Sequence, residues 1–98
     1  MFIKFKGNET EFTTDYVTEQ KLYKQGEATG WLLSLNLSGD FTAQELDAAL
    51  TEEGISEITL VGEREEGTVI SGYEKVTSCV VRYEKDTTTA EINIVKGV

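Results

Sequence analysis

The stretch that decides the fold is WLLSLNLSG, residues 31–39, where apolar and polar side chains alternate. Four large apolar side chains share one face of an extended chain here: Trp31, Leu33, Leu35 and Leu37. The opposite face is mostly serine and asparagine. This alternation predicts a strand with one face buried and the other toward water. Such one-sided strands are typical of an antiparallel sheet that is covered on one side.

The residues that follow, DFTAQELDAALTEEG at 40–54, predict one helix over about residues 42–53. Thr42 suits the N-cap and Glu45 the third helical position, so the two can form a capping box. The apolar stripe of this helix recurs at spacings of three and four: Leu46, Ala49 and Leu50. Gly54 suits the left-handed residue that ends a helix. We therefore expect a short helix that packs one narrow apolar stripe on a sheet.

Shorter runs on either side predict the remaining strands, at residues 2–5, 55–63, 68–74, 74–84 and 89–96. Residues 26–30, GEATG, are expected to form a loop, and residues 12–24 fit either a strand or a polar turn. Together the segments predict a single α+β domain over residues 1–98. Its mainly antiparallel β-sheet would have about 5–6 strands, with the helix on one face. The pattern leaves open whether the strands before and after the helix are neighbours.

The net charge of −9 is concentrated in residues 40–66, which hold nine acidic residues and one basic residue, a net of −8. Lys and Arg do not cluster, so direct nucleic acid binding is not expected. The acidic segment is either a solvated face or a surface that a basic protein partner recognises. No apolar run approaches the roughly 20 residues of a membrane span. The first residues do not resemble a cleaved secretion signal.

The chemistry available to this chain is narrow, because it contains no histidine and one cysteine, Cys79. Ser-His-Asp and Cys-His arrangements and a zinc site are therefore excluded. Cys79 lies inside a predicted strand, and Arg82, three residues on, points to the opposite face. We expect Cys79 to be a small buried strand residue. The carboxylates of residues 40–66 do not follow the spacing of a calcium-binding EF-hand loop. We expect no enzyme activity, metal or cofactor.

The tripeptide Tyr-Glu-Lys occurs twice, at 73–75 and 83–85. In an unbroken strand Tyr73 and Tyr83 would share a face with Cys79, and neither face would be cleanly apolar. This predicts a bulge or bend between Gly72 and Val76, which would put Tyr73 out of register with the residues that follow.

From Leu33 onward the order of features resembles small, largely uncharacterised prophage proteins of Gram-positive bacteria, often encoded among tail and baseplate genes. In such proteins a Gly-Tyr step leads into an alternating strand, and a polar turn leads to a final strand that ends in lysine. The residues that match are Gly72, Tyr73, Lys75, Val76, Ile92, Ile94, Val95 and Lys96. The resemblance covers roughly residues 31–98. It implies a viral accessory or structural role through protein–protein contact, with no catalytic residues to carry over.

Two hypotheses follow for the function. In the first, the chain is a tail-associated phage protein whose partners, viral or host proteins, contact the uncovered sheet face or an edge strand. In the second, it is an acidic phage-encoded inhibitor, anti-CRISPR-like or a DNA mimic, whose acidic segment occupies the basic groove of a host nucleic-acid enzyme. A bacterial adaptor with no viral link is a third option. The candidate partner-binding residues are Glu52, Glu53, Glu57, Glu63, Glu65, Glu66 and Tyr73. The expected location is the host bacterial cytoplasm or the virion.

Overall fold

A computed structural model describes residues 1–62 and 67–97 of the chain. The first half contains β1 (Phe2–Phe5), β2 (Phe12–Thr13), β3 (Val17–Lys24), β4 (Glu27–Gly39) and the helix α1 (Ala43–Ala49). The second half contains the helix α2 (Glu52–Ser56), β5 (Glu57–Val61), β6 (Thr68–Ser71), β7 (Lys75–Glu84) and β8 (Thr87–Gly97). The α+β class and the mainly antiparallel sheet are confirmed. The expected five to six strands and single helix are wrong, because the described residues form eight strands and two short helices.

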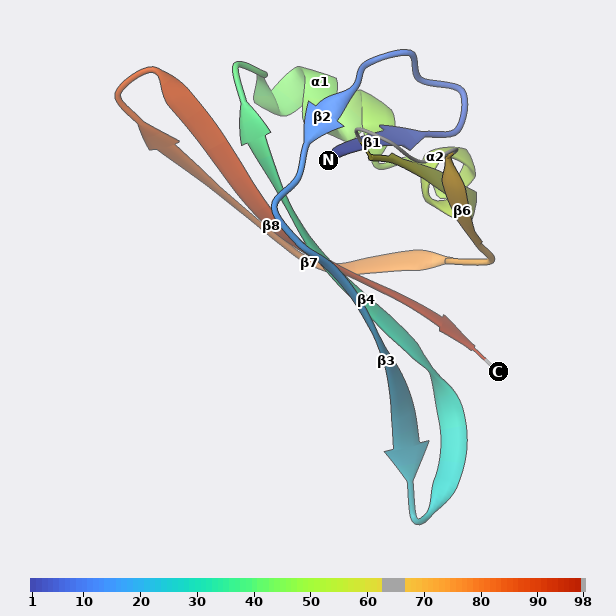
Figure 1. Ribbon diagram of the computed structural model, residues 1–98. Coiled ribbons are helices and arrows are strands. Elements are labelled where there is room, and N and C mark those ends of the chain that lie inside the picture. The colour runs from blue at the N-terminus through green and yellow to red at the C-terminus, as the bar shows by residue number, and fades with distance from the viewer. Residues whose placement is uncertain (63–66, 98) are drawn as a thin grey trace.

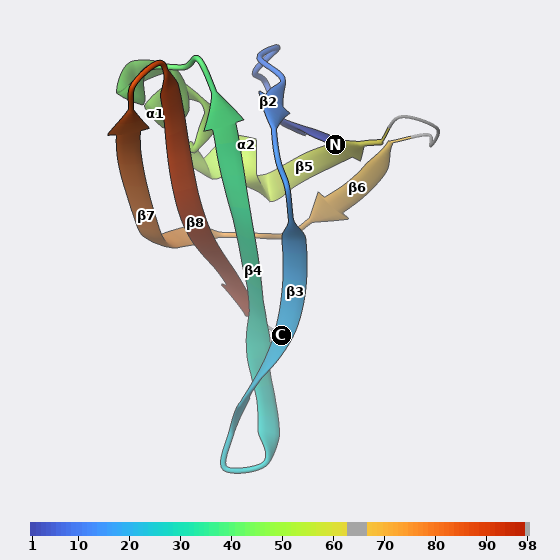
Figure 2. The ribbon, with the colours of Figure 1, turned by 60° about the vertical axis from the view of Figure 1, so that its left-hand side comes forward.

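All strands belong to one sheet, in the order β6-β5-β1-β2-β4-β8-β7, and every pairing between them is antiparallel. β3 lies off this path and pairs with the first part of β4. The long strand β4 therefore has β8 along one edge, and β2 and then β3 along the other (Figures 1 and 2). The strands before and after the helices, β4 and β5, are not neighbours, since β1 and β2 lie between them.

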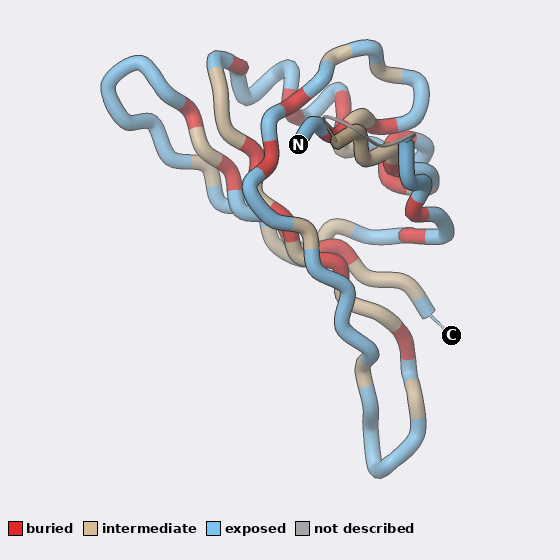
Figure 3. The backbone as a smooth tube through the Cα atoms, viewed as in Figure 1, coloured by how far each residue is buried: buried red, intermediate tan, exposed pale blue. Residues whose placement is uncertain are grey.

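The sheet curls around a single hydrophobic core, to which the two helices also contribute (Figures 2 and 3). The predicted alternation in β4 is confirmed, because Leu33, Leu35 and Leu37 are fully buried and the residues between them are half-buried. The core cluster contains Ile3, Phe5, Phe12, Leu33, Leu35, Leu37, Phe41, Leu46, Ala49, Ile55, Ile58, Ile70, Tyr73, Ala90, Ile92 and Ile94. Trp31, at the end of the apolar face, is half-buried against this cluster.

The predicted helix over residues 42–53 is in fact two helices with separate caps. Thr42 is the N-cap of α1, and its Oγ1 accepts a hydrogen bond from the Glu45 backbone N–H at 3.1 Å, as expected. α1 ends at Ala49, because Thr51 is extended and its Oγ1 accepts from the Gly54 N–H at 2.9 Å to start α2. A threonine that bonds the backbone locally competes with helix continuation in this way.

Gly54 therefore lies inside α2 and does not end a helix, which corrects the prediction. A side chain at this position would clash with the carbonyl oxygen of Ala49, so a glycine is needed for α1 and α2 to pack this closely. The strand predicted at 55–63 begins only at Glu57, because Ile55 and Ser56 complete α2.

The segment predicted as a loop at 26–30 is mostly strand, because β4 already begins at Glu27. The ambiguous residues 12–24 form β2 and β3 with a short break between them. The bend expected between Gly72 and Val76 is found at Gly72, whereas the register shift lies just beyond the predicted interval. Gly72 turns the chain with a φ of 88°, and the register of β7 against β8 shifts between Val76 and Ser78.

Candidate functional site

The most prominent surface feature is a two-stranded projection formed by the ends of β3 and β4 (Figure 2). The last described pair between β4 and β8 is Gly30↔Gly97. The hairpin that begins at the pair Leu22↔Gly30 extends beyond it, and from there its two strands pair only with each other. We call residues 22–30 the hairpin arm. At about 3.3 Å per residue, the three residues from Gly30 to Glu27 carry its tip about 10 Å beyond this last pair.

The turn at the tip of the arm explains why the arm can form. Gln25 and Gly26 have φ values of 51° and 82°, and they join the paired residues Lys24 and Glu27. Two consecutive residues with positive φ make a type I′ turn, whose twist matches that of the flanking strands. A two-residue turn of this kind was missed in the sequence because Gln-Gly is not one of the strongest hairpin signals, which are Asn-Gly and Asp-Gly.

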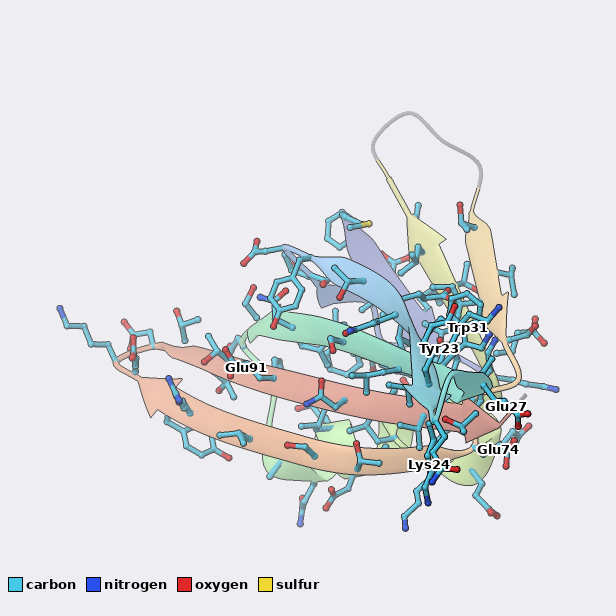
Figure 4. The ribbon with its side chains drawn as sticks, turned by 90° about the horizontal axis from the view of Figure 1, so that it is seen from below. Tyr23, Lys24, Glu27, Trp31, Glu74 and Glu91 are labelled. Carbon is cyan, nitrogen blue, oxygen red and sulfur yellow. The ribbon has the colours of Figure 1, made fainter. Side chains whose placement is uncertain are left out.

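The surface of the arm combines an aromatic ring with both signs of charge. Tyr23 is 64% exposed, and Lys24 and Glu27 are exposed beside it at the tip (Figure 4). At the base, the Lys21 ammonium lies 5.7 Å from the centre of the Trp31 ring, which is a cation–π contact. A thin projection with an exposed tyrosine suits insertion into a groove of another protein, since tyrosine is enriched at interfaces.

Two positions shape the strands from which the arm extends, and the first is Gly30. It is buried, and a side chain there would clash with the Lys96 carbonyl oxygen of β8. The absence of a side chain therefore lets β4 and β8 approach at the base of the arm.

The second position is Asn36, which bridges the break between β2 and β3. Its Oδ1 accepts hydrogen bonds from the backbone N–H groups of Asp15 at 2.8 Å and Tyr16 at 3.1 Å, and from the Thr14 hydroxyl at 3.2 Å. Its Nδ2 donates to the Asp15 carboxylate at 3.1 Å. Between β2 and β3 the backbone departs from β4. The Asn36 side chain there supplies the hydrogen bonds that backbone pairing with β4 would otherwise provide. The sequence showed Asn36 only as a polar residue on the outer face of a strand.

Tyr73, one of the predicted partner-binding residues, lies in the core with 1% of its surface exposed. The Lys96 ammonium sits 4.5 Å from the centre of its ring and donates a hydrogen bond to the Ser71 carbonyl oxygen at 2.8 Å. The Tyr73 hydroxyl is buried, and no hydrogen-bond partner for it lies among the described residues. Burial, then the charge of the nearby Glu19 carboxylate and a hydrogen-bonding contribution from the same group, raise the pKa of Tyr73 to about 12, although this pair does not reach the geometry of a full hydrogen bond. A direct contact between Tyr73 and a partner is therefore not favoured.

Three of the predicted acidic residues lie close together along the chain, between residues 52 and 57. Glu52 and Glu53 occupy the first turn of α2, and Glu57 begins β5. All three side chains are exposed. Carboxylates in the first turn of a helix are favoured by its dipole, which gives Glu52 and Glu53 a structural reason to be there. The predicted residues Glu63, Glu65 and Glu66 lie outside the described residues.

Cys79 was expected to be buried in a strand, and it lies instead on the edge strand β7 with its side chain exposed. The strand assignment is confirmed, and the burial is wrong because β7 has no neighbour beyond it in the sheet. Partial desolvation of the thiol, and secondly the charge of Asp47, raise the pKa of Cys79. The thiolate is the reactive form of cysteine, so this environment does not favour a nucleophile.

Within residues 1–62 and 67–97, no three His, Cys, Asp or Glu side chains are grouped in a way that could hold a metal ion. In the same residues, no helix combines the length and apolar character that crossing a membrane requires. Comparisons of the chain with protein-family models, with curated proteins and with solved structures found no match.

Proposed function

We propose that this chain is a non-enzymatic, phage-related accessory or structural protein that acts through protein–protein contact, in association with the phage tail. The observation that carries the proposal is the hairpin arm, which exposes Tyr23 at the end of a thin two-stranded projection. Tyrosine is enriched among the hot-spot residues of interfaces, where a partner buries its ring.

Two further features support a role in contact. Forming the arm as a bare hairpin gains little stability, because two strands without a third are marginal in water. An element of this kind is more easily explained by a partner than by the needs of the fold. The resemblance of residues 31–98 to prophage proteins encoded near tail and baseplate genes supports a viral partner. The expected location is then the virion or the host bacterial cytoplasm.

The test compares capture of viral proteins by the wild-type chain and by Tyr23→Ser, in lysates of an induced lysogen. Tyr16→Ser is the matched control, because Tyr16 is 42% exposed but lies between β2 and β3, outside the arm. We expect the wild type and the control to capture a tail or baseplate protein. Tyr23→Ser should capture at least about tenfold less, since loss of a hot-spot side chain costs about 2 kcal/mol or more.

Purified virions provide a second readout, because a tail-associated chain should be detected in them by mass spectrometry. The proposal fails if virions lack the chain and no viral structural protein is captured. Equal capture by the wild type and Tyr23→Ser would show that the arm is not the contact surface.

The second candidate function is inhibition of a host nucleic-acid enzyme, and the exposure of Glu52, Glu53 and Glu57 favours it. Their combined change to glutamine should then abolish binding to a nuclease or related enzyme with a basic groove. The matched control neutralises three exposed glutamates elsewhere: Glu9, Glu11 and Glu84. Equal loss of binding in both variants would indicate only an effect of net charge and would exclude a specific acidic surface.

A further inference from the structure

The sheet has three edges among the described residues, and they differ in how well they are protected. β6 is four residues long, so it offers few backbone groups with which a strand of another chain could pair. β3 places the charged side chains of Glu19 and Lys21 opposite Leu33 and Trp31, on the core side of the sheet. Short strands and charges that point inward are the usual protections of an edge against pairing with another chain.

β7 is ten residues long and lacks this inward charge. Cross-strand partners share a face, so its core side is identified by the buried residues of β8. Val76 pairs with Ile94, Cys79 with Ile92 and Val81 with Ala90, and Tyr83 follows on the same face. The opposite face has Lys75, Ser78, Val80, Arg82 and Glu84. Among the described residues, no strand pairs with this edge of β7 (Figures 2 and 4).

We propose that β7 pairs antiparallel with β7 of a second copy of this chain, around a two-fold axis at Val80. The two sheets then join into one continuous sheet across the axis. Such an isologous contact requires a strand whose two faces are complementary to themselves when the strand is reversed. The order of residues in β7 meets that requirement.

The register follows from charge and from the bulge in β7. With Val80 opposite Val80 of the second copy, Cys79 faces Val81 and Ser78 faces Arg82. Beyond the register shift at Thr77, Val76 then faces Tyr83, and Lys75 faces Glu84. Apolar side chains meet on the core side, and the two ends of the strand pair opposite charges, which stabilises the pairing.

The two neighbouring registers are less favourable. Centring the axis on Cys79 places Lys75 opposite Arg82, and like charges directly opposite one another are destabilising. Centring it on Val81 places Glu84 opposite Ser78 and moves Lys75 past the end of the strand, to a position opposite Asp86 in the turn that follows β7. The register centred on Val80 is the one in which both charged ends are complementary within the strand.

The contact should be weak. One strand pair buries on the order of 1,000 Å² or less, near the lower limit for a specific interface. The helix α1 lies on the core side, where the charge of Asp47 acts on Cys79, so two acidic helices flank the joint and repel each other. We expect a dissociation constant of roughly 10–100 μM, in the range of other small interfaces.

Disulfide crosslinking tests the register directly, in a Cys79→Ser background that removes the native thiol. In Val80→Cys the two thiols are directly opposite, with Cα atoms about 5 Å apart, which a disulfide can bridge. In the control Val81→Cys they are offset by two residues along the strand. This offset places the Cα atoms about 8 Å apart, beyond the reach of a disulfide.

Under mild oxidation at about 100 μM protein, near the expected dissociation constant, we expect a covalent dimer from Val80→Cys and almost none from Val81→Cys. Equal crosslinking at both positions, or crosslinking only at Val81, would overturn the proposed register. A wild-type chain that stays monomeric up to about 1 mM in sedimentation equilibrium would overturn the proposal altogether.

A second variant tests the same edge without crosslinking. Val80→Lys brings two ammonium groups together at the axis and should weaken the dimer at least tenfold. Val69→Lys is the matched control, because Val69 is 54% exposed, Val80 is 47% exposed, and Val69 lies on a different edge strand, β6. Circular dichroism and the fluorescence of Trp31 verify folding. An unchanged dimer in Val80→Lys contradicts the proposal. Because purified protein alone is used, the result is independent of the proposed phage partner.

Discussion

Replacing Tyr73 with phenylalanine should stabilise the protein, although it removes a hydroxyl group that most tyrosines use to form a hydrogen bond. The side chain is 1% exposed, and its hydroxyl has no hydrogen-bond partner among the described residues. Burying a hydroxyl without a partner costs about 1–3 kcal/mol in protein mutational data. Phenylalanine keeps the ring, so the packing and the cation–π contact with Lys96, 4.5 Å away, are preserved.

We therefore expect Tyr73→Phe to raise the free energy of unfolding by about 1 kcal/mol, the lower end of that range, because removing the hydroxyl leaves a small void. For a domain of about 100 residues, this corresponds to an increase in Tm of about 4–8 °C. Urea unfolding followed by the fluorescence of Trp31, the single tryptophan, measures the change. Tyr16→Phe is the control and should stay within about 0.5 kcal/mol, since Tyr16 is on the surface.

The dependence of the free energy of unfolding on pH, at alkaline pH, gives an independent test of this prediction. The pKa of Tyr73 is raised from 10.0 to about 12 in the folded state, so the unfolded chain releases this proton first. The contribution to stability is thus complete below about pH 10 and is lost as the pH rises from about 10 to about 12. Tyr73→Phe lacks this loss. Its advantage over the wild type should therefore widen across the same interval.

A result of the opposite sign would refute the reasoning. If Tyr73→Phe lowers the free energy of unfolding by about 1 kcal/mol, the hydroxyl must donate a hydrogen bond that is worth keeping. The nearby Glu19 carboxylate would be the acceptor. In that case Glu19→Gln should weaken the wild type and leave Tyr73→Phe unchanged, which a double-mutant cycle would reveal.

Three further changes test the features that build the fold. Gly54→Ala should cost about 2–3 kcal/mol by urea unfolding, because the new methyl group clashes with the Ala49 carbonyl oxygen. A neutral effect would mean that α1 and α2 are further apart than described. Asn36→Ala should cost about 2 kcal/mol, since the acceptor for two backbone N–H groups is lost. It should also speed hydrogen exchange at the start of β3, and unchanged exchange would contradict this role. Thr42→Ala should cost about 1 kcal/mol through loss of the N-cap of α1, and a change below about 0.3 kcal/mol would show that the cap contributes little.

The features that depend on local pattern were predictable from the sequence. The alternation of residues 31–39 identified the strand and its buried face, and the Thr42 cap identified the start of α1. Both follow from the side-chain periodicity and backbone hydrogen bonding of a few adjacent residues. The break between the two helices was missed because Thr51 competes as a second cap, an outcome that depends on the packing of Gly54 against Ala49.

The features that depend on strand order were not predictable. Periodicity showed that Cys79 lies in a strand, but its exposure follows from the position of β7 at the edge of the sheet. Tyr73 was a predicted partner-binding residue, and it is in fact a buried member of the core cluster, with the Lys96 ammonium 4.5 Å from the centre of its ring. The partner-binding role of the predicted glutamates stays a prediction, and Glu52, Glu53 and Glu57 are exposed among the described residues. The hairpin arm was not predicted, because residues 26–30 fitted a loop and residues 12–24 fitted either a strand or a polar turn.

The order of strands in the sheet has a consequence for the rate of folding. Ile3 pairs with Leu60 and Leu35 pairs with Ile92, so each of these pairings closes a loop of nearly 60 residues. The loop entropy of about 3–4 kcal/mol must be overcome before such contacts stabilise anything. Sheets dominated by distant pairings fold in milliseconds to seconds, far more slowly than helical bundles. During that interval the apolar strands of one chain are open to those of another. This chain should therefore refold efficiently when dilute and aggregate when concentrated.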